Sequence, residues 1–347
     1  MKQGKTISGQ ALGIDVSKNK LDCCYVVQSS DKHVAVKGTK SFDNTTLGFK
    51  KLIEWAGKKM IKDMPLTILM EATGCYHENI LEFLADNFEG AILVLVQGNM
   101  AKNFAKSLNR YSKTDKIDAK ILAQLAIERV HRPWKATPKN IRIIRDLLRQ
   151  RVKLICMQTQ LKNQRHAYSY GSGRQDINIA IYTEILDSLA IQIKKIGKAV
   201  KLEAQKDAAL SKNITLLETI PGIGTDTALC ILAETNQFIN YTSASKVISY
   251  AGYDILQCQS GTHVGKTRMS KKGNKYIRRQ LYCPAQSHIN ARGKFTALYE
   301  RLKGKNKKTL QASVAVQMRL LRLMFSMVKI GKCYDAEHQH QTLAKIA

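Results

Sequence analysis

The sequence lacks the marks of a secreted, zinc-binding or membrane-spanning protein. Its eight Cys include no C-x-x-C pair and no spacing typical of a zinc site, and the N-terminus has no apolar signal-peptide segment. The most apolar late stretch, residues 310–330, is interrupted by Arg319 and Arg322, so we expect a buried or partner helix rather than a membrane span. We expect a cytoplasmic protein whose cysteines are reduced core residues.

Acidic residues are scarce, and the scarcity is local. The formal charge is +29, from 56 Lys and Arg against 27 Asp and Glu. Residues 1–100 are nearly neutral, with 12 basic and 11 acidic residues, whereas residues 135–215 hold 16 against 6 and residues 261–332 hold 18 against 1. This segregation predicts a near-neutral catalytic core with nucleic-acid-binding parts attached. A membrane surface also attracts basic patches, so charge alone does not identify the partner.

The first hundred residues alternate short β-type runs with helical ones. We expect strands at residues 10–16, 20–28, 32–41, 66–70 and 91–96, with helices at 45–62 and 76–88. Three strands, helix, strand, helix, strand is the element order of an RNase H-like domain. The sequence therefore predicts an α/β RNase H-like N-terminal domain over residues 8–134.

The rest of the chain has a helical pattern. Residues 139–215 contain no Pro, and residues 135–215 predict two long helices separated by Gly171-Ser172-Gly173. We expect these helices to form a basic coiled-coil hairpin. The hairpin either contacts nucleic acid or serves as a solvated spacer. Residues 216–332 predict a mainly α C-terminal domain, and residues 333–347, with His338 and His340, predict a loose tail rather than a metal site.

The C-terminal domain opens with Ile220-Pro221-Gly222-Ile223-Gly224, which resembles a helix-hairpin-helix element. In such an element, backbone N–H groups at a Gly-rich turn approach a phosphate; an ordinary Pro-Gly turn is the alternative.

Four carboxylates carry the strongest chemical signal. Asp15 lies inside an apolar strand-like run, Glu71 closes another, and Asp115 and Asp118 open a helical segment three residues apart, on one face. Converging carboxylates repel one another, and a divalent cation is the usual compensation. Four of them suit two Mg²⁺ ions about 4 Å apart, with Mn²⁺ as a possible substitute. Taken singly, Asp115 and Asp118 also fit a helix N-cap and a first-turn charge.

Three further acids near these four, Asp22, Glu54 and Glu78, are expected to be surface residues.

Ser260 is the second reactive candidate, because a dense field of cations follows it. Cations bind phosphate and stabilise the charge of a pentacovalent transition state. No His or Asp base is evident beside Ser260, a Ser-Gly pair is common in ordinary loops, and Ser270 is expected to cap the helix that follows. The predicted nucleic-acid-binding residues are Gly222, Gly224, Lys266, Arg268, Lys271, Lys272, Lys275, Arg278 and Arg279.

Six motifs together resemble one family, the DEDD transposases of the insertion-sequence one-ten and eleven-eleven superfamily, which includes the Piv-type DNA invertases. They occur in the family's order between about residues 10 and 330. They are residues 13–18 (GIDVSK), 71–74 (EATG), 113–119 (KTDKIDA), 220–224 (IPGIG), 260–261 (SG) and 270–279 (SKKGNKYIRR).

The resemblance implies a RuvC-like catalytic domain in which Asp15, Glu71, Asp115 and Asp118 bind metal, and a C-terminal transposase domain in which Ser260 attacks and covalently holds a DNA strand. It further implies double-stranded donor and target DNA, a structured guide RNA encoded by the element, and a homo-oligomer. Whether the acids and the serine that act together belong to one subunit or two stays open.

Two other functions fit parts of the pattern. A RuvC-like structure-specific endonuclease, such as a Holliday-junction resolvase, would need the four acids but not Ser260, and would leave no protein–DNA adduct. A non-catalytic nucleic-acid-binding protein with a degenerate core would cleave nothing.

Overall fold

The computed structural model describes residues 6–72, 74–109, 114–170, 176–265, 267–305 and 307–335. The chain divides into two compact units, Met1–Ala136 and Thr137–Ala347. Each unit has its own core and is described by itself. The finer division at residues 215 and 332 stays a prediction.

The N-terminal unit is built on a five-stranded mixed sheet. Its strands are β1 (Ile7–Val16), β2 (Lys20–Ser29), β3 (Val34–Asp43), β4 (Leu66–Glu71) and β5 (Ala91–Val96). Their order is β3-β2-β1-β4-β5, in which β1, β2 and β3 pair antiparallel while β4 is parallel to both β1 and β5. All five predicted strands are confirmed.

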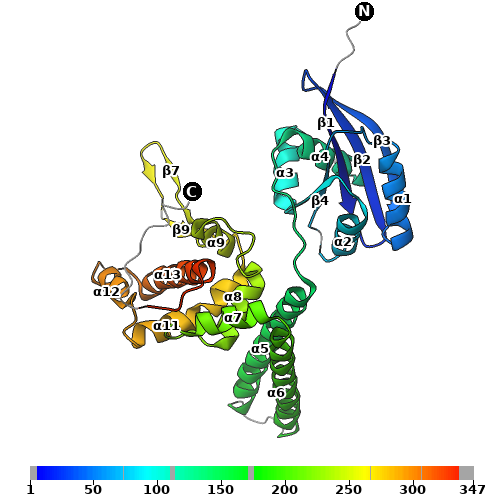
Figure 1. Cartoon of the computed structure of the whole chain (residues 1–347). Helices are drawn as coiled ribbons and strands as arrows, with labels where there is room; N and C mark the ends of the chain where they lie inside the picture. The colour runs from blue at the N-terminus through cyan, green and yellow to red at the C-terminus, as the bar shows by residue number, and fades with distance from the viewer. Residues whose placement is uncertain are drawn as a thin grey trace, which may run out of the picture. The chain divides into compact units, whose positions relative to one another are not determined.

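Helices cover both faces of this sheet (Figure 1). Leu12, Ile14 and Val16 of β1 pack toward α1 (Thr46–Gly57) and α2 (Glu78–Asn87), whereas Ala11 packs toward α3 (Gly98–Ser107) and α4 (Asp115–Glu128). Because side chains alternate along a strand, the odd-numbered positions of β1 face α4. Asp15 therefore emerges on the α4 face.

The second unit begins with a pair of long helices, α5 (Lys139–Ser169) and α6 (Asp176–Gln205), which pack against each other (Figure 1). Tyr168 and Tyr182 bring their rings to 5.6 Å between centroids near the far end of the pair. The two predicted long helices are confirmed, whereas their coiled-coil character stays a prediction and the predicted turn, Gly171-Ser172-Gly173, lies outside the described residues.

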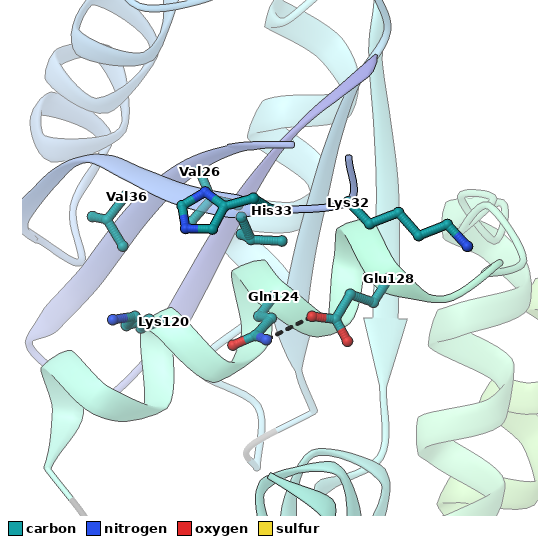
Figure 2. Close-up of a pocket in the computed structure, with 8 residues that line it drawn as sticks. Val26, Lys32, His33, Val36, Lys120, Gln124 and Glu128 are labelled. Atoms are coloured by element: carbon teal, nitrogen blue, oxygen red, sulfur yellow. Dashed lines mark hydrogen bonds between the residues drawn. The ribbon is translucent and has the colours of Figure 1, made fainter. Parts of the chain in front are cut away.

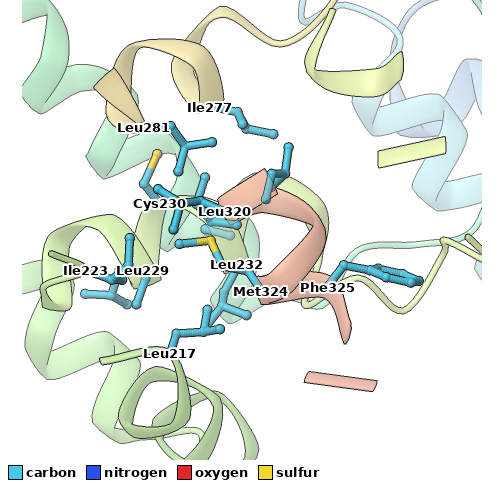
Figure 3. Close-up of a cluster of buried hydrophobic side chains, with 14 of the residues drawn as sticks. Leu217, Ile223, Leu229, Cys230, Leu232, Ile277, Leu281, Leu320, Met324 and Phe325 are labelled. Atoms are coloured by element: carbon cyan, nitrogen blue, oxygen red, sulfur yellow. The ribbon is translucent and has the colours of Figure 1, made fainter. Parts of the chain in front are cut away.

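A helical cluster completes the second unit. Its central helix, α8, is buried from Thr227 to Thr235, and Leu320 and Met324 of α13 pack with it into a single core (Figure 3). The predicted buried helix at residues 310–330 is confirmed. The helices of this cluster are α7 (Ala208–Glu218), α8 (Thr225–Thr235), α9 (Ala244–Ala251), α10 (Lys275–Gln280), α11 (Tyr282–Asn290), α12 (Thr296–Gly304) and α13 (Thr309–Ile330).

One part of the C-terminal region is not helical. Between α9 and α10 the chain forms a narrow β-arm, made of β6 (Ile255–Leu256), β7 (Gln259–Ser260), β8 (His263–Val264) and β9 (Arg268–Met269). β6 pairs with β9 at the base and β7 pairs with β8 near the tip. Figure 1 shows the arm (yellow) leaving the helical cluster beside α9.

In the described part of the chain, no helix is both long enough and apolar enough to cross a membrane. All eight Cys are unpaired. The prediction that they are core residues is right for Cys23, Cys24 and Cys230 and wrong for the other five, which are exposed. Cys occupies exposed as well as buried positions in this chain, so amino-acid composition alone does not predict which cysteines are buried.

Candidate nucleic-acid-processing sites

Two neighbouring strands place acidic side chains on the α4 face of the sheet. Asp15 lies at the end of β1 and Glu71 ends β4, and because these strands are parallel, their carboxyl ends lie at the same edge. Leu69 of β4 packs toward α4, so Glu71, two residues later, faces the same way. The predicted pairing of Asp15 with Glu71 across one sheet edge is thus present in the fold.

Helix α4 carries the other two predicted acids in its first turn. Thr114 caps this helix by accepting a hydrogen bond from the Ile117 N–H at 3.3 Å, so Asp115 and Asp118 stand at the positive end of the helix dipole. Thr114, rather than Asp115, is the N-cap. The cap position is therefore filled without either acid.

Gly13 allows α4 to approach β1 closely. A Cβ at this position would overlap the backbone of Ala119 and Ala123, so only glycine fits where the strand and the helix meet. Gly13 lies two residues before Asp15, and Ala119 follows Asp118. This contact sets the separation between the strand acids and the helix acids.

The surroundings of Asp15 disfavour its charged form. Burial raises the pKa of Asp15 to about 6, and Asp118, Asp115, Glu71 and Asp22 each add to the rise. The other three predicted acids, Glu71, Asp115 and Asp118, therefore lie near enough to Asp15 to raise its pKa. Carboxylate oxygens are hard ligands that suit a divalent cation, and a cation would remove the repulsion that raises this pKa. As placed, no three His, Cys, Asp or Glu side chains in the described ranges form a ready-made ligand set.

Asp22 departs from the surface position that its sequence context predicts. It is 4% exposed and lies directly across the β1–β2 ladder from Asp15. Its carboxylate accepts a hydrogen bond from Ser41 and pairs with Lys20 Nζ at 3.0 Å. Its place in β2, on the same face as Asp15, explains the burial. Glu54 and Glu78 are exposed, as predicted.

Glu71 lies against the start of α3. Its Oε1 atom lies 2.5 Å from where a Cβ at Gly98 would be, and Gly98 is the first residue of that helix. Glycine at this position leaves room for the carboxylate at a helix N-terminus, where the helix dipole favours negative charge. The sequence offers Gly98 only as a residue after an apolar strand, which is too common a pattern to reveal this role.

Ser260 lies near the tip of the β-arm, with its residue exposed to solvent. The two-residue turn begins at Gly261, whose φ of 55° is the left-handed value that the first central residue of a tight hairpin turn needs. The turn pairs Ser260 with His263. The sequence made no His base evident beside Ser260, but the hairpin folds His263 back across from it.

The basic segment after the arm divides into exposed and anchored residues. Lys271, Lys272 and Lys275 are exposed, as is Arg268 in β9. Arg278, by contrast, donates to the Ala251 carbonyl at 2.7 Å. Of the other predicted contacts, Arg279 donates to Cys156 Sγ at 3.0 Å, and Lys266 lies outside the described residues.

The anchored part of this segment is held by an ion pair between a half-buried arginine and a buried glutamate. Arg149 of α5 donates two hydrogen bonds, of 2.8 and 2.7 Å, to Glu234 of α8, whose side chain is 1% exposed. Glu234 raises the pKa of Arg149 further. Asn274 donates to the same carboxylate at 2.7 Å, and its Oδ1 caps α10 by accepting from the Tyr276 and Ile277 N–H groups.

The turn before α8 positions the two predicted glycines differently. Gly222 has a φ of 89°, and an added Cβ would press on the backbone of α11, so packing requires glycine there. Gly224 is the N-cap of α8 and has open space beside it. Acids stand near this helix start, since Thr225 donates to Glu218 at 2.5 Å and Asp226 pairs with Arg151 at 2.7 Å. Phosphate binding at Gly224 stays a prediction.

A cavity of about 300 Å³ lies elsewhere in the N-terminal unit, between the β2–β3 region and α4 (Figure 2). Lys32, His33 and Lys120 line it, together with Gln124, which donates to Glu128 at 2.6 Å. None of the predicted site residues lines this cavity.

Comparison with known proteins gives consistent matches along the chain. A model of IS110-type DEDD transposases, described as a transposase, matches residues 12–168, and a model described as the transposase IS116/IS110/IS902 family matches residues 214–300. The chain is 26% identical over 329 residues to the pilin gene-inverting protein of Moraxella bovis, covering 93% of this chain and 97% of that protein.

A second relative aligns with a smaller part of this chain. An IS110 insertion-element protein of Streptomyces coelicolor is 25% identical over 169 residues, which is 48% of this chain and 40% of that protein. A solved Ppx/GppA family structure from Aquifex aeolicus aligns over 94% of this chain and 92% of that chain, but with only 8% identity and a TM-score of 0.22, which does not indicate a shared fold.

Proposed function

This chain belongs to the IS110 family of transposases and is a DNA recombination enzyme; from that premise we propose that it cuts and rejoins DNA with a Mg²⁺-dependent acid site and a serine nucleophile. The acid site comprises Asp15, Glu71, Asp115 and Asp118. The nucleophile is Ser260. The gathering of three acids around Asp15, together with its raised pKa, is the observation that carries the proposal.

The N-terminal unit has the features expected of an RNase H-like, RuvC-like catalytic domain. Its strand order, with an antiparallel β1–β2–β3 meander and parallel β4 and β5, supports that assignment. So does the position of the acids, which come from the ends of two neighbouring parallel strands and from the helix that crosses them. The proposed domain limits are residues 8–134, 135–215 and 216–332, with a tail at 333–347.

Membership of a DEDD transposase family implies use of a divalent metal ion. We assign this role to Mg²⁺, with Mn²⁺ as a substitute, and to the oxygen ligands of the four acids. The bound ions would lower the charge on the scissile phosphate and on the leaving oxygen. The residues themselves fix the geometry: Gly13 sets the distance of α4 from β1, and Gly98 leaves space for Glu71.

Ser260 would supply the covalent step. Its exposed place near the tip of a narrow arm gives a DNA strand access to its Oγ atom without displacing a helix. The acids and Ser260 belong to separate compact units, so a reaction that uses both must bring the two units together on DNA. A homo-oligomer could supply them from one copy or from two.

The partners follow from charge and from the relatives. Arg268 lies in the arm and Lys271, Lys272 and Lys275 follow it; all four are exposed cations that suit phosphate backbones. We propose that they bind double-stranded donor and target DNA, and that the basic α5–α6 hairpin binds a structured guide RNA encoded by the element. The likeness to a pilin gene-inverting protein supports inversion as one outcome of the reaction.

A covalent-trap assay tests the proposal. The full chain is expressed with its native flanking DNA, so that any guide RNA is present, and is supplied with Mg²⁺ and the joined element ends. We expect a DNA-linked protein band on denaturing gels that is lost in Ser260→Ala and Asp118→Ala but kept in Ser270→Ala. Ser270 is a suitable control because its hydroxyl donates to the Gly252 carbonyl in the same region.

Two results would contradict the proposal. Cleavage without an adduct, equally strong in Ser260→Ala, would show a hydrolytic RuvC-like endonuclease. Metal-independent binding with no cleavage would show a non-catalytic nucleic-acid-binding protein.

A further inference from the structure

The β-arm places an imidazole next to the proposed nucleophile. Ser260 and His263 are directly opposed residues of the β7–β8 pair, joined by the two-residue turn Gly261-Thr262. Directly opposed residues of an antiparallel pair carry their side chains on the same face, with Cβ atoms about 4.5–5.5 Å apart. Both residues are exposed to solvent.

The ring already lies along this face. His263 Nε2 is 3.6 Å from where a Cβ at Gly265 would be, and the Gly265 N–H donates to the Cys258 carbonyl at 2.7 Å. The imidazole ring of His263 therefore lies beside the hydrogen-bonded residues Cys258 and Gly265 rather than against Ser260. Rotation about the His263 side-chain bonds carries an imidazole nitrogen toward Ser260 Oγ, because the side chain is long enough to span the cross-strand gap.

Glycine at residue 265 keeps that face open. A Cβ there would meet the Cys258 carbonyl oxygen at 2.9 Å and narrow the space beside the ring. The hairpin thus combines a nucleophile and a directly opposed imidazole. Imidazole is the side chain whose charge changes nearest neutral pH, which suits it to accept and return a proton.

We propose that His263 is the general base and acid for Ser260; this inference rests on the proposed serine mechanism. As the bond between Ser260 Oγ and phosphorus forms, the bond between phosphorus and the leaving deoxyribose oxygen breaks, and that oxygen keeps the electron pair. The Oγ proton passes to an imidazole nitrogen of His263. The imidazolium then gives this proton to the leaving oxygen, and rejoining reverses both transfers.

The test measures the rate of adduct formation by the full chain with its native RNA and DNA. Positioned acid–base groups contribute about 10²–10⁴-fold, so His263→Ala should slow adduct formation by about 100-fold or more. Added imidazole should restore part of the rate to His263→Ala, since it supplies the missing group. Gln259→Ala is the matched control, because it alters the same two-residue strand on the opposite face and should keep a near-normal rate.

The outcomes separate this inference from the serine mechanism itself. If Ser260→Ala still forms the adduct, the serine mechanism is wrong, whatever His263 does. If the adduct requires Ser260 but His263→Ala is as fast as Gln259→Ala, only the role of His263 is overturned. A slow His263→Ala that imidazole does not restore, but that His263→Gln does, would show a structural role and would also overturn the inference.

Discussion

Gly13 is the residue through which the fold most directly controls the acid site. In Gly13→Ala the new methyl group would overlap the Ala119 and Ala123 backbone, and backbone atoms of a buried helix cannot rotate away. Overpacking of a core costs up to about 3 kcal/mol. For a unit of this size, that cost lowers the unfolding midpoint by roughly 10 °C.

The functional effect should exceed the loss of stability. Relief of the overlap pushes α4 from β1, and the helix takes Asp115 and Asp118 with it. Displacements of about 1 Å at a catalytic group cost about 100-fold in rate. We therefore expect Gly13→Ala to lose recombination by about that factor even at temperatures where the N-terminal unit remains folded.

Gly9→Ala is the matched control on the same strand. A Cβ at Gly9 would meet the Ile127 side chain at 3.4 Å, an ordinary contact. Thermal unfolding followed by circular dichroism, together with the covalent-trap assay, compares the two variants. If Gly13→Ala unfolds and recombines like Gly9→Ala, then α4 does not set the acid geometry through this contact.

Three further predictions concern charge. The pKa of Asp15 is raised from 3.8 to about 6, so the folded state binds this proton more tightly than the unfolded state does. The free energy of unfolding therefore falls as the pH rises between these two values. Asp15→Asn should raise the thermal unfolding midpoint of the metal-free protein at neutral pH but not at about pH 4. Thermal unfolding at both pH values, with and without Mg²⁺, should show Mg²⁺ stabilising only the wild type, and only at neutral pH. Arg149→Met should lower the free energy of unfolding, measured in urea, by about 3–5 kcal/mol, because it leaves the Glu234 carboxylate buried without its cation. The double variant Arg149→Met with Glu234→Gln should recover part of that loss. Lys271→Gln with Lys272→Gln should lower the slope of log binding constant against log salt by about 0.9 for each phosphate that the variant no longer neutralises, and an unchanged slope in a filter-binding titration would place the DNA-binding surface elsewhere.

The N-terminal fold was predictable because its signals are local. Strands such as β4 are continuous apolar runs bounded by polar residues, and the acids at their ends stand out against that background. The burial of Asp22 was not predictable in the same way. It depends on β2 lying against β1 in one particular register, which the run of residues 20–28 does not specify by itself.

The β-arm shows the other limit of sequence reasoning. Its strands are two residues long, too short for an alternating pattern, so the region between α9 and α10 reads as loop. Ser260 was identified by the cations that follow it. His263 was missed because three residues of sequence separation say nothing about a cross-strand pair until the Gly261 turn is known.

The ion pair between Arg149 and Glu234 couples movement of the α5–α6 pair to α8. α5 has 31 residues and is therefore about 46 Å long, so a 10° rotation at its base displaces its far end by about 8 Å. Arg149, about a third of the way along α5, holds the Glu234 carboxylate that also binds Asn274, the cap of α10. A molecule that binds the far end of the α5–α6 pair and rotates it would therefore displace Arg149 and Glu234, and with them Asn274 at the start of α10.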